Sequence, residues 1–282
     1  MPRAATIVLD TSKLRTFLGR TRVAINWVLG RQAMAPGVTP YDDDVWIVSY
    51  PRSGNTWTRF LIGNLVAGNE PVDWSNIERH VPDIYLNFDP QLRAVPRPRY
   101  LKSHEAYRPD YRRVVLIVRD PRDVALSYFH FLRKSNRLGA DSALEEFLPP
   151  FLAGQIGNFG SWGENVGSWL GARRGSAGFL VVRYEDLLEN AEAQLARVAE
   201  MLKLPADNGQ LRRAVENSRA DRMRDLERSQ RSQHKYLKSS REDIPFVRVA
   251  KSGQWRTELS PEAARQIEAA WGPVMRELGY LP

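Results

Sequence analysis

The stretch Val45–Trp57, with the sequence VWIVSYPRSGNTW, constrains the fold more than any other part of the chain. An apolar run stops at Tyr50-Pro51, and apolar residues at helical spacing resume after Trp57. This order predicts a buried strand, a tight loop and a helix. The backbone N–H groups at a helix start have no intrahelical partner, so such a loop favours an anion. Arg52 adds a charge, and Gly54 lets the backbone approach a ligand closely.

Later segments repeat this order. The run 114–119 is continuously apolar up to its final Arg, as in a strand buried within a parallel sheet, and a helix is predicted directly after it. Further strands are predicted at 99–104 and 179–184, and further helices at 142–153, 161–171, 185–202, 206–227 and 260–277, the last with Ser260 as N-cap. The alternation predicts an α/β fold with a central parallel β-sheet flanked by helices.

Composition and breaker residues indicate how the chain is organised. The 282 residues, 43% of them apolar, can build a sizeable core. Pro and Gly at 35–40 predict a linker, which separates an N-terminal segment, 1–40, from one domain, 41–282. The segments 67–98 and 228–245 are predicted to be loops. The absence of cysteine excludes disulfides and thiol nucleophiles, and it favours a cytoplasmic protein.

The net charge of +8 is concentrated late in the chain, where 13 Lys and Arg stand against 6 Asp and Glu between Arg212 and Arg256. This region is interpreted either as a solvated face or as a lid over a polyanionic ligand. Residues 12–32 form a basic amphipathic pattern, which fits a helix packed on the domain or a peripheral contact with an anionic membrane. We expect no signal peptide and no membrane span.

Five motifs, in order, resemble those of the sulfotransferases that use 3′-phosphoadenosine 5′-phosphosulfate (PAPS), in particular soluble, bacterial-like members. The family loop Y-P-K-S-G-T-T-W reads Y-P-R-S-G-N-T-W at 50–57. The family's K-T-H reads K-S-H at 102–104, and its late F-x-R-K-G-x-x-G-D-W reads F-V-R-V-A-K-S-G-Q-W at 246–255. The other two motifs are a strand-ending Arg119 with Ser127 eight residues later, and Y-E-D-L at 184–187. The resemblance spans residues 45–256 and implies a P-loop-containing nucleotide hydrolase-like fold and sulfotransferase activity.

The resemblance also implies a role for each motif residue. The implied ligands of the 5′-phosphosulfate are Arg52, Ser53, Gly54, Asn55 and Thr56, with Trp57 stacked on the adenine. The implied ligands of the 3′-phosphate and the adenine are Arg119, Ser127, Tyr184, Ser218, Arg248 and Lys251. In sulfuryl transfer the acceptor hydroxyl loses a proton while charge grows on the leaving phosphate. We therefore expect in-line displacement with His104 as general base, Arg52 and Lys102 stabilising charge, and no metal.

Several positions depart from the family pattern. Arg52 replaces the usual Lys and cannot donate a proton, so its expected role is electrostatic and hydrogen-bonding. Asn55 replaces a Thr, and Val249 and Ala250 replace Lys and Gly in the late motif. A Thr-Val dimer motif is not visible, so the oligomeric state stays open.

The acceptor and two rival functions also stay open. A hydroxylated small molecule, a lipid or a glycoside would fit the loops 67–98 and 228–245, which we expect to shape the acceptor pocket. A P-loop kinase-like phosphotransferase would need G-x-x-x-x-G-K-[ST] and a magnesium-binding acid. A non-enzymatic protein that binds anionic ligands or a membrane surface would give no reason for His104. We do not expect nucleic-acid binding.

Overall fold

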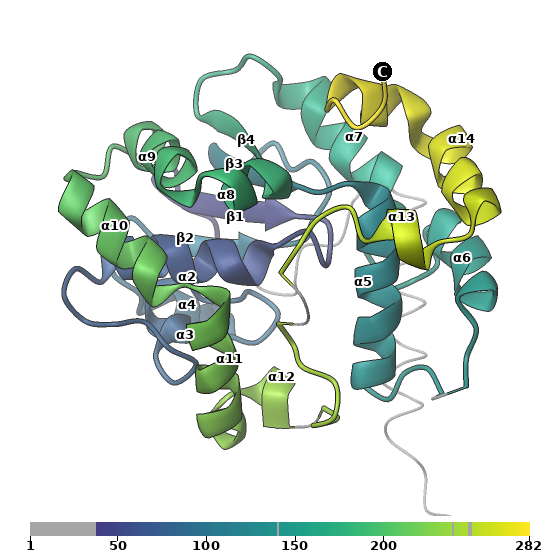
Figure 1. Ribbon diagram of the computed structural model, residues 1–282. Coiled ribbons are helices and arrows are strands. Elements are labelled where there is room, and N and C mark those ends of the chain that lie inside the picture. Colours follow the sequence, from purple (N-terminus) through teal and green to yellow (C-terminus); the bar gives the residue numbers. More distant parts are fainter. Residues whose placement is uncertain (1–37, 140, 239, 248–249) are drawn as a thin grey trace, which may run out of the picture. The chain divides into compact units, whose positions relative to one another are not determined.

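The computed structural model describes residues 38–139, 141–238, 240–247 and 250–282, and Figure 1 shows its ribbon. The chain divides into Met1–Val38 and Thr39–Pro282, and every helix and strand below belongs to the second unit. The helix predicted over 12–32 and the predicted ligand Arg248 lie outside the described residues.

The described strands form one parallel sheet in the order β2-β1-β3-β4. They are β1 (Val45–Ser49), β2 (Tyr100–Ser103), β3 (Arg113–Val118) and β4 (Phe179–Arg183). Strand β1 lies between β2 and β3, with Val48 opposite Ser103 on one side and Leu116 on the other. The chain thus passes from β1 to β2 on one side and then crosses to β3 on the other, and in α/β sheets ligands bind at such a change of direction, beyond the carboxyl ends of the strands. The predicted α/β fold is confirmed.

Successive residues of β1 point to opposite faces of the sheet, and both faces are covered. Val45 and Ile47 join the main apolar cluster together with Phe60 of the following helix. Trp46 instead stacks on Tyr111, with ring centroids 3.5 Å apart. All five residues of β1 are buried, as the continuous apolar run predicts.

The helices form two groups around the sheet (Figure 1). One group contains α2 (Asn55–Val66), α8 (Tyr184–Glu189), α9 (Ala191–Leu202) and α10 (Asn208–Asn217). The other contains α5 (Pro121–Lys134), α6 (Leu144–Leu152), α7 (Trp162–Arg173), α13 (Trp255–Glu258) and α14 (Pro261–Glu277). Ser260 caps α14 as predicted, because its Oγ accepts the N–H of Ala263 at 3.2 Å. Among the described helices, none has the length and apolar character needed to cross a membrane.

Four predicted segments differ in detail from the structure. The helix predicted over 185–202 is divided into α8 and α9 at Asn190, whose backbone is not helical. The helix predicted over 206–227 is two helices, α10 and α11 (Ala220–Ser229), because Arg219 takes an extended conformation between them. The predicted loop 67–98 contains α3 (Ile77–His80) and α4 (Asp89–Arg93). A proline stands in the first turn of α4, where its missing N–H costs nothing. The predicted loop 228–245 contains the 3-10 helix η1 (Arg231–Gln233) and α12 (Lys235–Lys238).

Candidate functional site

The loop between β1 and α2 has the geometry of an anion site. Gly54 has a φ of 100° and Arg52 a φ of 71°, so the chain turns sharply before the helix. The first intrahelical bond runs from the Thr58 N–H to the Gly54 carbonyl at 3.1 Å, and no side chain caps the N-terminus. The N–H groups of residues 55–57 therefore precede the helical ladder, as expected of a loop that binds an anion.

The loop side chains differ in what they contact. The Ser53 hydroxyl is buried and has no hydrogen-bond partner in the described structure, so it can bond to a ligand. The Asn55 side chain points back into the fold, and its Nδ2 donates to the Ile47 carbonyl at 3.1 Å and to Ser49 Oγ at 3.2 Å. Asn55 can therefore contribute its backbone N–H to a ligand, whereas its Nδ2 is engaged within the fold.

His104 follows β2 at the same edge of the sheet. Its Nδ1 lies 2.7 Å from the Ser49 carbonyl oxygen, which can only accept a hydrogen bond, so Nδ1 carries the proton and Nε2 keeps a lone pair. Burial lowers the pKa of His104 well below its usual value, and the charge of Lys102 lowers it further. A neutral imidazole with a free Nε2 is the form that a general base requires. Tyr85 and Phe159 contact the ring, with centroids 5.9 and 5.4 Å away.

Lys102 precedes His104 by two residues and is also engaged. Its Nζ lies 2.7 Å from Asp83 Oδ2, and the Lys102 and Asp83 side chains are 7% and 0% exposed. The ring centroid of Tyr85 lies 5.0 Å from the same ammonium group. Burial lowers the pKa of Lys102, while the Asp83 carboxylate raises it.

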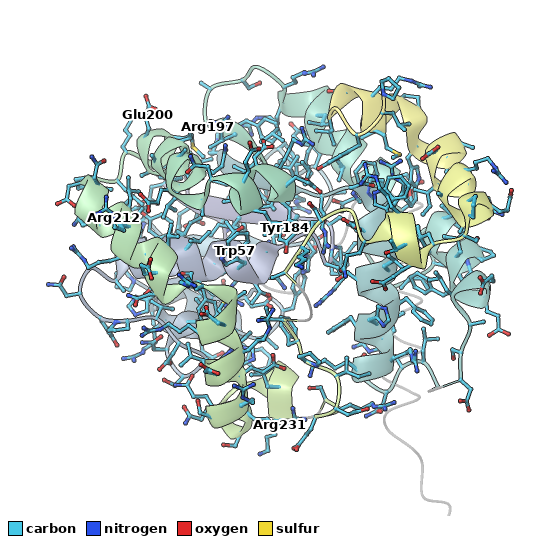
Figure 2. The ribbon with its side chains drawn as sticks, in the orientation of Figure 1. Trp57, Tyr184, Arg197, Glu200, Arg212 and Arg231 are labelled. Atoms are coloured by element: carbon cyan, nitrogen blue, oxygen red, sulfur yellow. The ribbon has the colours of Figure 1, made fainter. Side chains whose placement is uncertain are left out.

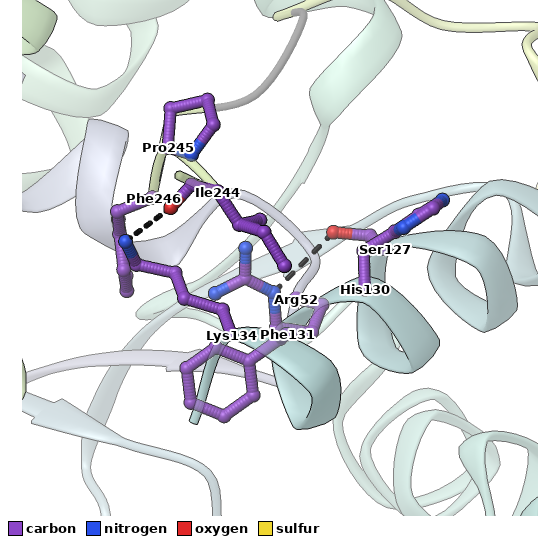
Figure 3. Close-up of a pocket in the computed structure, with 8 residues that line it drawn as sticks. All are labelled: Arg52, Ser127, His130, Phe131, Lys134, Ile244, Pro245 and Phe246. Atoms are coloured by element: carbon purple, nitrogen blue, oxygen red, sulfur yellow. Dashed lines mark hydrogen bonds between the residues drawn. The ribbon is translucent and has the colours of Figure 1, made fainter. Parts of the chain in front are cut away.

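Arg52 links the loop to α5, as Figure 3 shows. Its Nε donates to Ser127 Oγ at 3.3 Å, so the two predicted anion sites meet through one hydrogen bond. The guanidinium carbon also lies 4.7 Å from the ring centroid of Phe131 and 4.9 Å from that of Phe246. These groups belong to a small pocket lined by Arg52, Ser127, His130, Phe131, Lys134, Ile244, Pro245 and Phe246.

Arg119, Tyr184 and Trp57 lie together at the ends of β3 and β4 and the start of α2. The Arg119 guanidinium carbon lies 4.5 Å from the Tyr184 ring centroid, and the Trp57 and Tyr184 rings meet edge to face at 5.8 Å. Figure 2 shows Trp57 and Tyr184 next to each other in front of the sheet. Arg119 Nε is buried without a hydrogen-bond partner in the described structure, so it can donate to a ligand.

The late motif reaches the site through backbone contacts. The Arg119 Nη2 donates to the Lys251 carbonyl at 3.2 Å, while the Lys251 side chain is exposed. The buried carboxylate of Asp123 accepts the N–H of Gly253 at 2.6 Å and that of Trp255 at 3.0 Å. Asp123 therefore attaches the 250–256 segment to the start of α5.

Ser218 lies in the packing between α2 and α10. It is fully buried; its Oγ donates to the Ala214 carbonyl at 2.7 Å and accepts from Asn64 Nδ2 at 3.2 Å. Both hydroxyl functions are thus engaged within the fold. Its role beside adenine stays a prediction, as do the ligand roles of the other motif residues.

Sequence reasoning missed several residues that hold the site together. Asp83 and Tyr85 lie in a segment interpreted only as loop, and no motif marks them. Asp123 stands in the first turn of α5, where acidic residues are favoured, and this local signal gives no hint of its contact with Gly253. Phe246 belongs to the late motif, but its contact with Arg52 depends on the path of the chain between them.

Comparisons with known proteins identify the family of the chain. A sulfotransferase domain model matches residues 42–279. Sulfotransferase 1B1 of Mus musculus is 26% identical over 244 residues, covering 81% of each protein, and sulfotransferase 2B1 of Homo sapiens is 24% identical over 255 residues, covering 86% of this chain and 68% of the relative.

Solved structures show the same fold. A crystal structure of retinol dehydratase with androsterone and the inactive cofactor PAP matches with a TM-score of 0.68 at 22% identity, covering 85% of this chain and 82% of that one. A mouse sulfotransferase complexed with PAP matches with a TM-score of 0.67 at 22% identity, covering 85% and 86%. The family match spans most of the chain and includes every motif predicted from the sequence. The chain therefore belongs to the PAPS-dependent sulfotransferase family.

Proposed function

We propose that the protein transfers the sulfuryl group of PAPS to the hydroxyl group of a small-molecule acceptor by in-line displacement, with His104 as general base. The observation that carries this proposal is the position of His104 beside the anion loop. Its protonated Nδ1 faces the Ser49 carbonyl at 2.7 Å, which leaves the Nε2 lone pair for the acceptor. Ser49 is the last residue of β1, which leads into the anion loop, so the same strand positions both His104 and the loop.

The reaction balances as a single displacement. His104 Nε2 takes the acceptor proton while the acceptor oxygen forms a bond to sulfur. The bond from sulfur to the bridging oxygen breaks, and PAP leaves with that electron pair. Arg52 and Lys102 carry positive charge near the reacting group, which stabilises the charge that grows on the leaving oxygen.

The donor would occupy the edge of the sheet along the ends of β1, β3 and β4. The N–H groups of residues 54–57, with Arg52 and Ser53, suit the 5′-phosphosulfate. Arg119 and Ser127 suit the 3′-phosphate, as do Arg248 and Lys251 of the late motif. The Trp57 ring would stack on adenine, with Tyr184 and Ser218 near it. The segment 244–246, which lies against Arg52, supports the interpretation of the late basic region as a cover over the donor.

The side chains beside His104 bear on the class of acceptor. Aromatic rings of Tyr85 and Phe159 flank His104, and they suit a flat or apolar body that carries a hydroxyl group. A lipid and a glycoside are the other two classes that we propose to test. A hydroxylated small molecule is favoured because one neighbouring structure holds androsterone.

A binding assay and a transfer assay test the proposal separately. PAP at 100 times its Kd should stabilise the fold by about 2.7 kcal/mol in a thermal-shift experiment, and ATP should stabilise it much less. His104→Ala should abolish transfer from labelled PAPS in a screen of phenols, sterols and glycosides, yet retain the PAP-dependent shift. No shift at saturating PAP would contradict the donor assignment, and transfer from ATP instead of PAPS would favour a kinase.

A further inference from the structure

The segment Pro82–Tyr85 runs beside β2 and holds its last residues. The Lys102 N–H donates to the Pro82 carbonyl at 2.9 Å, and the Ile84 N–H donates to the Lys102 carbonyl at 3.3 Å. These two bonds form an isolated parallel bridge between Asp83 and Lys102. The His104 N–H donates to the Tyr85 hydroxyl at 2.8 Å. The segment therefore fixes the backbone of both Lys102 and His104.

Within this segment Asp83 forms a buried ion pair with Lys102. The distance from Nζ to Oδ2 is 2.7 Å, and Asp83 is fully buried. An ammonium group in such a place loses most of its hydration, so without a nearby carboxylate it would tend to release its proton. Other charged or titratable groups around Lys102 are Arg59 of α2, Glu78 of α3, Tyr85, and His104 at the end of its own strand. Arg59 lowers the pKa of Lys102, whereas Glu78 raises it.

Asp83 is itself held in one orientation. Its Oδ1 accepts the Tyr85 N–H at 2.9 Å, which leaves Oδ2 for Lys102. The Asp83 N–H donates to Glu78 Oε2 at 2.7 Å, and the other oxygen of Glu78 lies 2.7 Å from Arg59 Nη2. Groups that are fixed before the substrate binds stabilise developing charge without reorganising. Asp83 is therefore built to set the position of Lys102.

We propose that Asp83 is a positioning residue, which keeps Lys102 protonated and places its ammonium group beside the reacting sulfuryl group. This inference rests on the proposed function, in which Lys102 stabilises charge. Removing the Asp83 carboxylate leaves burial and the Arg59 charge, which oppose protonation of Lys102, against the charge of Glu78, which favours it. Lys102 would then lose its proton at a lower pH, and activity that depends on the ammonium would be lost with it.

The test is the pH profile of kcat/KM for the wild type and Asp83→Asn. We expect the alkaline limb of the variant to move to lower pH by about 1 to 3 pH units, the range typical of a lost ion pair. Asp83→Glu, which retains a carboxylate, should return the alkaline limb most of the way to its wild-type position. The thermal shift with PAP should remain in each variant and shows that it is folded. An unmoved alkaline limb in folded Asp83→Asn would overturn the inference.

A second pair of variants shows whether the effect passes through Lys102. Arginine keeps its charge throughout the accessible pH range. Lys102→Arg and the double variant Asp83→Asn, Lys102→Arg should therefore share one alkaline profile. A displacement that persists between these two would overturn the inference, because it could not arise from Lys102. This comparison also decides the question if the single Asp83→Asn variant fails to fold.

A matched control separates the effect from general loss of stability. Asp44 and Arg99, which directly precede β1 and β2, form another buried ion pair, 2.5 Å apart. Asp44→Asn should destabilise the fold but leave the alkaline limb in place, and a displaced limb in this control would count against a specific role for Asp83. Transfer by the wild type is measured first, and its absence would reject the proposed function. Normal wild-type transfer together with an unmoved alkaline limb in Asp83→Asn would reject only the role of Asp83.

Discussion

Replacing Gly54 with alanine adds one methyl group at the most crowded point of the anion loop. A Cβ built on Gly54 would lie 2.5 Å from Cδ2 of the Tyr184 ring, and the Gly54 φ is 100°. The left-handed backbone costs a non-glycine residue about 1–2 kcal/mol, and overpacking adds about 1–3 kcal/mol. We therefore expect Gly54→Ala to lower the free energy of unfolding by about 2–5 kcal/mol.

Gly68→Ala is the matched control for this prediction. Gly68 also has a positive φ, 67°, but a Cβ there would meet nothing within 4 Å. It should carry only the backbone cost, so the apparent Tm of Gly54→Ala should lie below that of Gly68→Ala by about 2–9 °C, at about 2–3 °C per kcal/mol. Only Gly54→Ala should also weaken the PAP-dependent shift, because the methyl group displaces the loop or the ring.

The contact with Tyr184 can be isolated with a double variant. Adding Tyr184→Ala to Gly54→Ala removes the ring that the new methyl group meets, so the combined loss of stability should be smaller than the sum of the single losses by about 1 kcal/mol or more. Equal Tm losses for Gly54→Ala and Gly68→Ala, together with additive losses in the double variant, would refute the reasoning from packing.

Three further predictions concern the same site. Arg52→Lys keeps the charge but loses the guanidinium group whose Nε donates to Ser127. We expect kcat/KM for PAPS to fall about 10-fold, which corresponds to about 1.4 kcal/mol of transition-state stabilisation. An unchanged value would mean that charge alone is needed. Asp123→Asn weakens the hydrogen bonding that attaches the turn at Gly253 to α5, by about 1–3 kcal/mol. The variant should show a lower apparent Tm and faster proteolysis within 250–256. Unchanged cleavage would contradict this attachment. Burial lowers the pKa of His104 in the folded chain, so the unfolded chain binds a proton at this residue more readily. The free energy of unfolding should therefore decline as pH falls below about 6.5. Urea titrations should show a weaker decline for His104→Gln, and equal declines would contradict the role of burial.

The sequence by itself determined the elements whose causes are local. The apolar run 45–49 predicts a buried strand because neighbouring side chains on both faces must leave water, and Gly54 permits the turn that exposes helix N–H groups. The alternation of such units determined the α/β class. Because parallel strands end at one edge, His104 and Arg119 could be expected near the loop before any distance was known.

Only the tertiary structure decided which distant side chains complete the site. Asp83 meets Lys102 across 19 residues, and Asp123 meets Gly253 across 130 residues. Such pairs depend on the path of the intervening chain, and a carboxylate in a loop has the same local signature whether it faces solvent or an ammonium group. For the same reason the Asn55 side chain, which resembles a loop ligand in sequence, turns inward to β1, where buried oxygen atoms accept the hydrogen bonds of its Nδ2.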